Sequence, residues 1–356
     1  MLPRERVLTA LAHQTPDKVP TDFWAVEEIW DRLKRHFGTE RKDELLDHLG
    51  VDIRRARPDY IGPPIRYLED GSYDLPDGTH RRKVANQFGV HEEYAGFPLS
   101  ECESVEEILA WDRWPDAGHY DWEGFSQKIG QKHERYFIKL ELGGPFERAW
   151  SLRGYERYLM DMAAEPEIPH AIMERLTRYY IDFVTRAMEA AGDKIDLVYT
   201  WDDIATQNSL LMSPQMWEEF VRPYHVRIDR VIHGYGKRVM YHSCGAVRPM
   251  IPRLMELPID VLNPLQPLAA GMSDLEGIKG EFGDRLTFHG AIDIQELLPH
   301  GTPEEVEREV RRVISVLGRD GGYILCSAHF IQADTPLENV LALYRAADET
   351  GREEKR

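Results

Sequence analysis

Residues 285–327 read RLTFHGAIDIQELLPHGTPEEVEREVRRVISVLGRDGGYILCS, and the order of patterns in this stretch decides the fold class. The apolar runs at 285–291 and 321–327 are short and end in polar residues, as buried parallel strands do. Between them, residues 302–318 place apolar side chains on one helical face, with Thr302 as the N-cap and a proline at the first helical position. A strand, a helix and a second strand in this order predict a parallel sheet covered by helices.

The same alternation runs through the rest of the chain. Six further short apolar runs predict strands, at 19–23, 51–56, 136–142, 195–202, 237–244 and 260–264. Amphipathic helical segments, such as 252–257, lie between most of them. Eight strands separated by helices favour one closed (β/α)₈ TIM barrel of the α/β class, spanning residues 1–356, over an open doubly wound sheet. No G-x-G-x-x-G motif follows any of these runs, which argues further against a dinucleotide-binding fold.

Residues 61–98 interrupt the alternation with Gly- and Pro-marked turns and short alternating runs. Asp-Gly pairs at 70–71 and 77–78 are typical of tight hairpin turns. We therefore expect a β-hairpin insertion after the second strand, lying over the catalytic end of the barrel.

The composition excludes several classes of protein. The chain has 44 Lys and Arg against 62 Asp and Glu, a net charge of −18, which opposes binding to nucleic acid or to an anionic membrane surface. No stretch approaches the ~20 consecutive apolar residues of a membrane span, and the N-terminal segment does not have the pattern of a signal peptide. Three cysteines cannot build a disulfide scaffold. We expect a soluble cytoplasmic protein, and a homodimer is one assembly that the sequence leaves open.

Acidic side chains follow two of the predicted strands at the end where a (β/α)₈ barrel carries its active site. Glu141 lies at the end of the third strand, and Asp202 and Asp203 lie at the end of the fourth. These carboxylates could protonate a leaving group, orient a substrate or contact a metal. The alternative for Asp202 and Asp203 is N-capping of the helix that follows their strand.

A potential metal site lies at the ends of the fifth and eighth strands. His242 and Cys244 are two residues apart, so they lie on the same side if the strand continues to its end. Cys326 ends the eighth strand. Two thiolates and one imidazole suit zinc, and three protein ligands leave a fourth position open, as in catalytic sites. Each residue taken alone is more typical of a buried core position, and only the three together favour a metal site. The third cysteine, Cys102, lies in a polar stretch at a predicted helix start and is assigned no role.

Further polar and aromatic residues near the strand ends predict a substrate pocket. Asn263, Gln266, His289 and His329 are candidates for hydrogen-bonding side chains that line it. Trp24, Phe146, Tyr199, Trp201 and Phe288 could form an apolar wall that accepts an aromatic ring. Aromatic residues near barrel strand ends are also often plain core.

Several segments resemble one known family. MYHSCGAV at 240–247, GYILCSAH at 322–329, IQADTPLENVLALYRAA at 331–347 and RERVLTALAHQTPDKVP at 4–20 resemble the uroporphyrinogen decarboxylase superfamily. The H-x-C…C arrangement looks like the zinc site of its methyltransferase branch, whose members work with a corrinoid protein. The resemblance implies a (β/α)₈ barrel with zinc held by His242, Cys244 and Cys326.

The sequence differs from the true decarboxylases in the segment that follows the first strand. Those enzymes resemble one another in an arginine-rich segment that holds the carboxylates of the tetrapyrrole, whereas residues 21–35 read TDFWAVEEIWDRLKR. Asp22, Glu27 and Glu28 stand where cations would be needed, so a polycarboxylate substrate would meet like charge. No D-x-H-x-x-G corrinoid signature is present, so a corrinoid would arrive on a separate protein.

The leading hypothesis is a zinc-dependent methyltransferase. It would move a methyl group from a small methylated substrate, such as an aryl methyl ether in O-demethylation, to the cobalt of a separate corrinoid protein. The ligands allow the reverse direction equally, from a methylcorrinoid to a thiol or tetrahydrofolate. A zinc-independent decarboxylase on the same barrel, and a non-enzymatic accessory protein that binds a corrinoid or a metal, remain the alternatives.

Overall fold

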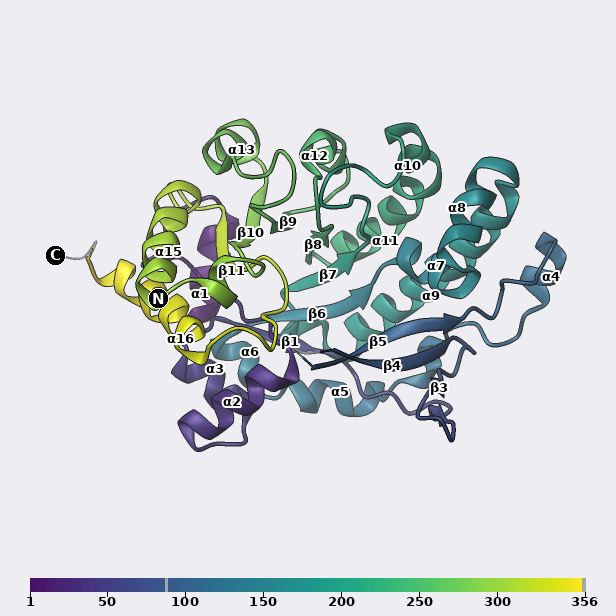
Figure 1. Cartoon of the computed structure of the whole chain (residues 1–356), viewed down its shortest axis with the longest axis horizontal. Coiled ribbons are helices and arrows are strands. Elements are labelled where there is room, and N and C mark those ends of the chain that lie inside the picture. The colour runs from purple at the N-terminus through teal and green to yellow at the C-terminus, as the bar shows by residue number, and fades with distance from the viewer. Residues whose placement is uncertain (87–88, 354–356) are drawn as a thin grey trace.

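Seven parallel strands form the curved sheet at the centre of the molecule (Figure 1). The computed structural model describes residues 1–86 and 89–353. In spatial order the strands are β1 (Ile53–Ala56), β6 (Phe137–Gly143), β7 (Leu197–Trp201), β8 (Arg238–His242), β9 (Val261–Leu265), β10 (Thr287–Ile292) and β11 (Tyr323–Ser327). Each neighbouring pair is parallel, as the βαβ pattern predicted. The chain therefore has the α/β architecture of a TIM barrel.

The strand predicted at 19–23 is reduced to a single bridge, in which Thr21 pairs with Leu325 of β11 in parallel. The Thr21 carbonyl accepts the Asp52 N–H at 3.0 Å, so this segment spans the gap between β11 and the start of β1. The Thr21 N–H donates to the side chain of Asp52 at 2.9 Å. Pro20 has no N–H to donate at all. These two departures interrupt the ladder, so the prediction of a full strand at this position was wrong.

Helices surround the sheet (Figure 1). They are α1 (Pro3–Leu11), α2 (Glu27–Phe37), α3 (Lys42–His48), α4 (Val105–Ala110), α5 (Trp122–Ile129), α6 (Lys132–Arg135), α7 (Pro145–Arg153), α8 (Tyr155–Ala164), α9 (Glu167–Ala191), α10 (Pro214–Phe220), α11 (Arg222–Gly234), α12 (Ile251–Leu254), α13 (Leu275–Phe282), α14 (Leu297–His300), α15 (Pro303–Leu317) and α16 (Leu337–Glu353). Short 3₁₀ turns cover Ala117–His119, Gly192–Lys194 and Arg248–Met250. None of the helices in the described ranges is long and apolar enough to cross a bilayer.

Two helix predictions differ in how well they match. The helix predicted at 302–318 is α15, and Thr302 and Glu305 form a reciprocal capping box at its start. The segment predicted at 252–257 is helical only to Leu254, because the Leu257 N–H bonds three residues back, to Leu254, instead of four.

The predicted insertion after the second strand is a four-stranded antiparallel sheet. Its strands are β2 (Arg66–Tyr67), β3 (Tyr73–Asp74), β4 (His80–Asn86) and β5 (Gly89–Gly96), and residues 87–88 lie outside the described residues. The turns predicted at the two Asp-Gly pairs place Gly71 and Gly78 at φ values of +82° and +76°. Asp77 forms an ion pair with Arg148 of α7. This contact ties the insertion to the helix that follows the carboxyl end of β6.

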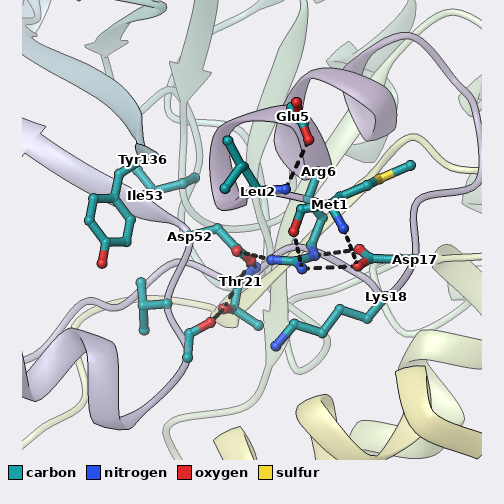
Figure 2. Close-up of polar contacts among 12 residues, drawn as sticks. Met1, Leu2, Glu5, Arg6, Asp17, Lys18, Thr21, Asp52, Ile53 and Tyr136 are labelled. Atoms are coloured by element: carbon teal, nitrogen blue, oxygen red, sulfur yellow. Dashed lines mark hydrogen bonds and ion pairs between the residues drawn. The ribbon is translucent and has the colours of Figure 1, made fainter. Parts of the chain in front are cut away.

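The amino-terminal end of the barrel is held by a buried arginine (Figure 2). The Arg6 Nε donates to Asp17 at 2.7 Å, and its Nη1 donates to Asp52. The second oxygen of Asp52 accepts the Thr21 N–H. One side chain of α1 therefore fixes the segment at 19–23, which was predicted as the first strand.

The barrel interior is apolar at this end and polar at the other. An apolar cluster joins α1 to the amino-terminal residues of the strands. It comprises Val7, Leu11, Ile53, Phe137, Leu197, Val261 and Ile324. Trp24, Tyr199, Met240 and Cys326 continue the cluster toward the carboxyl ends. A second, larger core lies between the sheet and the helices. With the amino-terminal end filled, a site inside the barrel can open only at the carboxyl ends of the strands.

Candidate metal centre

Three side chains with metal-ligand chemistry meet at the carboxyl ends of β8 and β11. Their ligand atoms, one each from His242, Cys244 and His329, lie within 4.8 Å of one another. The Cys244 Sγ is 3.3 Å from the His242 Nε2. His242 is buried, while Cys244 and His329 are partly exposed, so the group is reachable from outside. One thiolate and two imidazoles form a donor set suited to zinc, and three protein ligands leave room for a substrate atom.

The grouping differs from the predicted ligand set at one position. Cys326 is fully buried inside the barrel in the cluster that contains Trp24 and Met240, and its Sγ lies 3.8 Å from the Ser327 Oγ. His329, predicted to line the pocket, supplies the third ligand atom of the group. A ligand role for Cys326 stays a prediction, and the geometry favours His329.

The loop after β8 is held by side chains from its neighbours. The Cys244 N–H donates to Asp203 Oδ1 at 2.6 Å, and the Gly245 N–H donates to Gln266 Oε1 at 2.9 Å. Gly245 has a φ of +94°, and a Cβ there would lie 2.4 Å from the carbonyl oxygen of Thr206. This position therefore needs glycine. The predicted pocket residue Gln266 serves to anchor the loop that carries Cys244.

The two adjacent aspartates after β7 have different surroundings. Asp202 is fully buried and accepts the N–H groups of Phe146 and Glu147 at 2.9 and 2.7 Å, so it caps the start of α7. It also bonds to His225 Nε2 at 2.6 Å. Asp203 is 38% exposed, and its Oδ1 lies 3.6 Å from His242 Nε2. A catalytic role for Asp202 stays a prediction that its capping contacts disfavour, whereas Asp203 lies beside the metal-ligand group.

Sequence reasoning missed Glu147, in the first turn of α7. Burial, with the nearby carboxylates of Asp203 and Asp202, raises the pKa of Glu147 to about 8. Its carboxyl group is therefore mostly protonated at neutral pH. Its place just after the Gly-Gly-Pro-Phe turn that follows the third predicted strand was the available signal. The predicted catalytic residue Glu141 instead forms an ion pair with Arg55 of β1.

Aromatic rings surround the metal-ligand group. Trp24 stacks on His242 with centroids 6.1 Å apart and planes inclined by 23°, and Tyr199 meets the same imidazole edge-on at 6.0 Å. Trp201 contacts Tyr199 at 5.2 Å, and Phe330, which was not predicted, contacts Trp24 at 5.6 Å. Two other predicted wall residues, Phe146 and Phe288, are fully buried in the core outside the sheet. The four rings in mutual contact beside His242 are thus Trp24, Tyr199, Trp201 and Phe330, which we call the aromatic wall.

Two predicted pocket residues lie behind His242. The His242 Nδ1 is 2.5 Å from Asn263 Oδ1, and Asn263 Nδ2 is 2.6 Å from His289 Nδ1. His289 Nε2 is 3.2 Å from Asp22 Oδ2, and Asp22 also forms an ion pair with Lys139. Burial lowers the pKa of His289 and would raise that of Asp22, but Lys139 and His289 hold the pKa of Asp22 below its usual value. His289 is therefore a neutral imidazole beside an ionised carboxylate.

Comparison with known proteins gives a consistent result. The sequence profile of the family described as uroporphyrinogen decarboxylase (URO-D) matches residues 137–350. A methylated-thiol–coenzyme M methyltransferase of Methanosarcina mazei is 28% identical over 209 residues, which cover 59% of this chain and 52% of that protein. A uroporphyrinogen decarboxylase of Pseudoalteromonas translucida is 24% identical over 191 residues, which cover 52% of this chain and 49% of that protein. The chain spans about half the length of the curated relatives it matches.

A solved structure described as a methyltransferase from Methanosarcina mazei has the same fold. It superposes with a TM-score of 0.67 at 19% sequence identity and covers 98% of this chain and 99% of that chain. The likeness therefore extends beyond the segment that the family profile matches.

Proposed function

The chain belongs to the uroporphyrinogen decarboxylase family, and from that premise we propose that it is a zinc-dependent methyltransferase. It transfers a methyl group from a small methylated substrate to the cobalt of a separate corrinoid protein. The observation that carries the proposal is the meeting of His242, Cys244 and His329 at the open end of the barrel, with an aromatic wall beside them. A tetrapyrrole decarboxylase has no evident use for a thiol and two imidazoles arranged in this way.

Different residues of the site would bind zinc, position the thiol of Cys244, exclude water and supply a proton. Zinc held by His242, Cys244 and His329 would supply Lewis acidity, which stabilises the negative charge that develops on the substrate heteroatom as the methyl group leaves. Asp203 holds the backbone of Cys244, so the thiol is positioned before substrate arrives. Trp24, Tyr199 and Trp201 exclude water from one side of the methyl group.

The reaction balances with one proton. The bond between the methyl carbon and the heteroatom breaks, and its electron pair stays on the heteroatom. A cobalt(I) centre on the acceptor protein would supply the electron pair of the new carbon–cobalt bond. The carboxyl proton of Glu147, retained at neutral pH, then passes to the leaving heteroatom.

Two substrate classes fit the proposal. The relative named for methylated thiols favours a methyl thioether or methanethiol, whose sulfur is a soft ligand. The aromatic wall favours an aryl methyl ether, as in O-demethylation. Both substrates present one heteroatom to the metal and one methyl group to the cobalt.

Metal analysis with matched variants tests the proposal. We expect purified protein to hold stoichiometric zinc, and Cys244→Ala and His329→Ala to lose it. Cys326→Ala, which removes a buried thiol outside the group, should retain zinc. Methyl transfer to cob(I)alamin should follow zinc content across these variants, with substrates of both classes. Wild-type protein without bound metal would refute the proposal, and loss of zinc in Cys326→Ala alone would restore the ligand set predicted from the sequence.

The second candidate is a zinc-independent decarboxylase, which relatives such as the Pseudoalteromonas translucida enzyme favour. The structure weakens the sequence-based argument that acidic side chains would repel a polycarboxylate substrate. Asp22 is buried against Lys139, and Glu27 pairs with Lys42 at the surface, so neither presents a free carboxylate to a substrate. Release of CO₂ from uroporphyrinogen, unaffected by a zinc chelator, would support this candidate and contradict the first.

A further inference from the structure

A continuous line of buried polar side chains runs from Asp22 to the metal-ligand group. It comprises Asp22, His289, Asn263 and His242, joined by contacts of 3.2, 2.6 and 2.5 Å. All four side chains are buried inside the barrel. Four hydrogen-bonding residues in one line, each from a different segment of the chain, are costly to bury unless every donor meets an acceptor. The directions of these hydrogen bonds can therefore be worked out.

The carboxylate at the far end sets the directions. An ionised carboxylate only accepts hydrogen bonds, so His289 must carry its proton on Nε2. The neutral His289 then has a lone pair on Nδ1, which accepts from the amide of Asn263. That leaves the Asn263 Oδ1 facing His242, and an oxygen can only accept, so His242 carries its proton on Nδ1.

The opposite set of hydrogen-bond directions is excluded by the contact between His289 and Asp22. If the Asn263 amide were reversed, His289 would donate from Nδ1 and would turn the Nε2 lone pair toward the carboxylate oxygen. Two acceptors would then face each other without a proton between them, in a fully buried position. One contact at the other end agrees with the first direction. The Cys244 thiol lies 3.3 Å from His242 Nε2, where a lone pair can accept the S–H.

We propose that Asp22, His289 and Asn263 are positioning residues that hold His242 in the Nδ1–H tautomer, so that its Nε2 lone pair is presented to the metal. The metal itself rests on the proposed function; the tautomer does not. Lys139 has a separate task, because it neutralises Asp22 and lies over the Trp24 ring at 4.5 Å. Trp24 also donates its indole N–H to Asp22 at 2.8 Å. The carboxylate is therefore fixed from three sides.

The first test reads the tautomer directly in zinc-free protein. Nitrogen NMR of ¹⁵N-histidine-labelled chain distinguishes protonated from unprotonated ring nitrogens, and His242→Gln and His289→Gln assign the two signals. We expect His242 with the proton on Nδ1 and His289 with the proton on Nε2. A His242 signal with the proton on Nε2 in wild-type protein overturns the proposal, whether or not the protein binds zinc.

The second test measures zinc affinity by competition with a chelator. Asp22→Asn alone leaves Lys139 buried without a partner and can unfold the protein, so the variant to use is Asp22→Asn with Lys139→Met, which keeps the charge balanced. We expect zinc to bind about 10- to 100-fold more weakly, with His242 shifted to a mixture of tautomers. Asp52→Asn is the matched control, because it removes an equally buried carboxylate at the opposite end of the barrel.

A rescue variant separates positioning from general damage. Asn263→Asp places a carboxylate directly on the His242 Nδ1–H, so the double change at Asp22 and Lys139 should no longer matter in its presence. We expect the triple variant to recover most of the zinc affinity. Unchanged zinc affinity and an unchanged His242 tautomer in the double variant would overturn the proposal. Wild-type protein that binds no zinc would refute the proposed function alone, since the tautomer is decided by the NMR measurement.

Discussion

Asp229 of α11 is the buried carboxyl group whose replacement should change stability most with pH. Its side chain is fully buried, and among the described residues neither oxygen has a hydrogen-bond partner. Burial raises the pKa of Asp229 to about 7. The charge of Asp260 raises this pKa further, whereas the charge of His225 lowers it. His225 in turn bonds Asp202 through Nε2 and leaves its Nδ1 without a partner in the described part of the chain.

The sign of the effect follows from this raised pKa. Asp229 loses its proton near pH 3.8 in the unfolded chain and near pH 7 in the folded protein. The folded state therefore binds the proton more tightly, and stability falls as pH rises through this interval. At about 1.36 kcal/mol per pKa unit, the penalty is about 4 kcal/mol at pH 8 and about 2 kcal/mol at pH 5. The raised pKa of His225 acts with the same sign, because this imidazole also binds its proton more tightly in the folded protein.

Asp229→Asn replaces the carboxyl group with a neutral amide of the same shape. We expect the variant to be more stable than wild type at both pH values, with the gain about 2 kcal/mol larger at pH 8 than at pH 5. Urea unfolding at the two pH values measures this difference. Asp182→Asn is the control, since Asp182 is partly exposed and, within the described residues, is paired with Arg186 on the same helix. A variant no more stable than wild type at pH 8, or a gain independent of pH, would refute the reasoning.

Three further predictions concern the site. Gly245→Ala should cost about 1–3 kcal/mol of stability and weaken zinc binding, because the positive φ strains alanine and its Cβ would clash with the Thr206 carbonyl oxygen. Urea unfolding and zinc titration measure both effects, and a variant unchanged in both would contradict the prediction. Glu147→Gln should lower kcat by about 100-fold and abolish the fall in wild-type kcat above about pH 8, whereas a preserved profile excludes Glu147 as the acid. Zinc at 100 times its Kd should stabilise wild-type protein by about 2.7 kcal/mol, and Cys244→Ala should show no such gain in thermal unfolding.

The sequence predicted the sheet well because strands buried on both faces have a strong local signature. From β6 onward, every predicted run corresponds to an observed strand, with ends that shift by at most two residues. The exception at 19–23 comes from contacts that are distant in sequence. Asp52 takes the Thr21 N–H that a strand would have donated to a backbone carbonyl. No pattern within the segment itself reveals this competition.

The roles of the polar residues were harder to predict, because they depend on direction as well as position. Asn263 and His289 are near the strand ends, as a pocket requires. However, Asn263 contacts His242 and His289 contacts Asp22, so both residues support the metal ligand His242 instead of lining a pocket. Asp22 itself was interpreted as a charge that repels anions. Lys139, 117 residues later, makes it a buried partner instead.

The spacing of residues along the sequence did not identify the third residue of the metal-ligand group. Cys326 lies within β11, and alternation along the strand turns its side chain into the barrel beside Trp24 and Met240. β11 ends at Ser327, and His329 follows two residues later, where the backbone is free to leave the strand path. His242 is the last residue of β8 and Cys244 lies two residues beyond it, so a third ligand for the same metal must lie at or beyond the end of its own strand. His329 meets that condition and Cys326 does not, because the height of a residue along the barrel axis decides which side chains can meet.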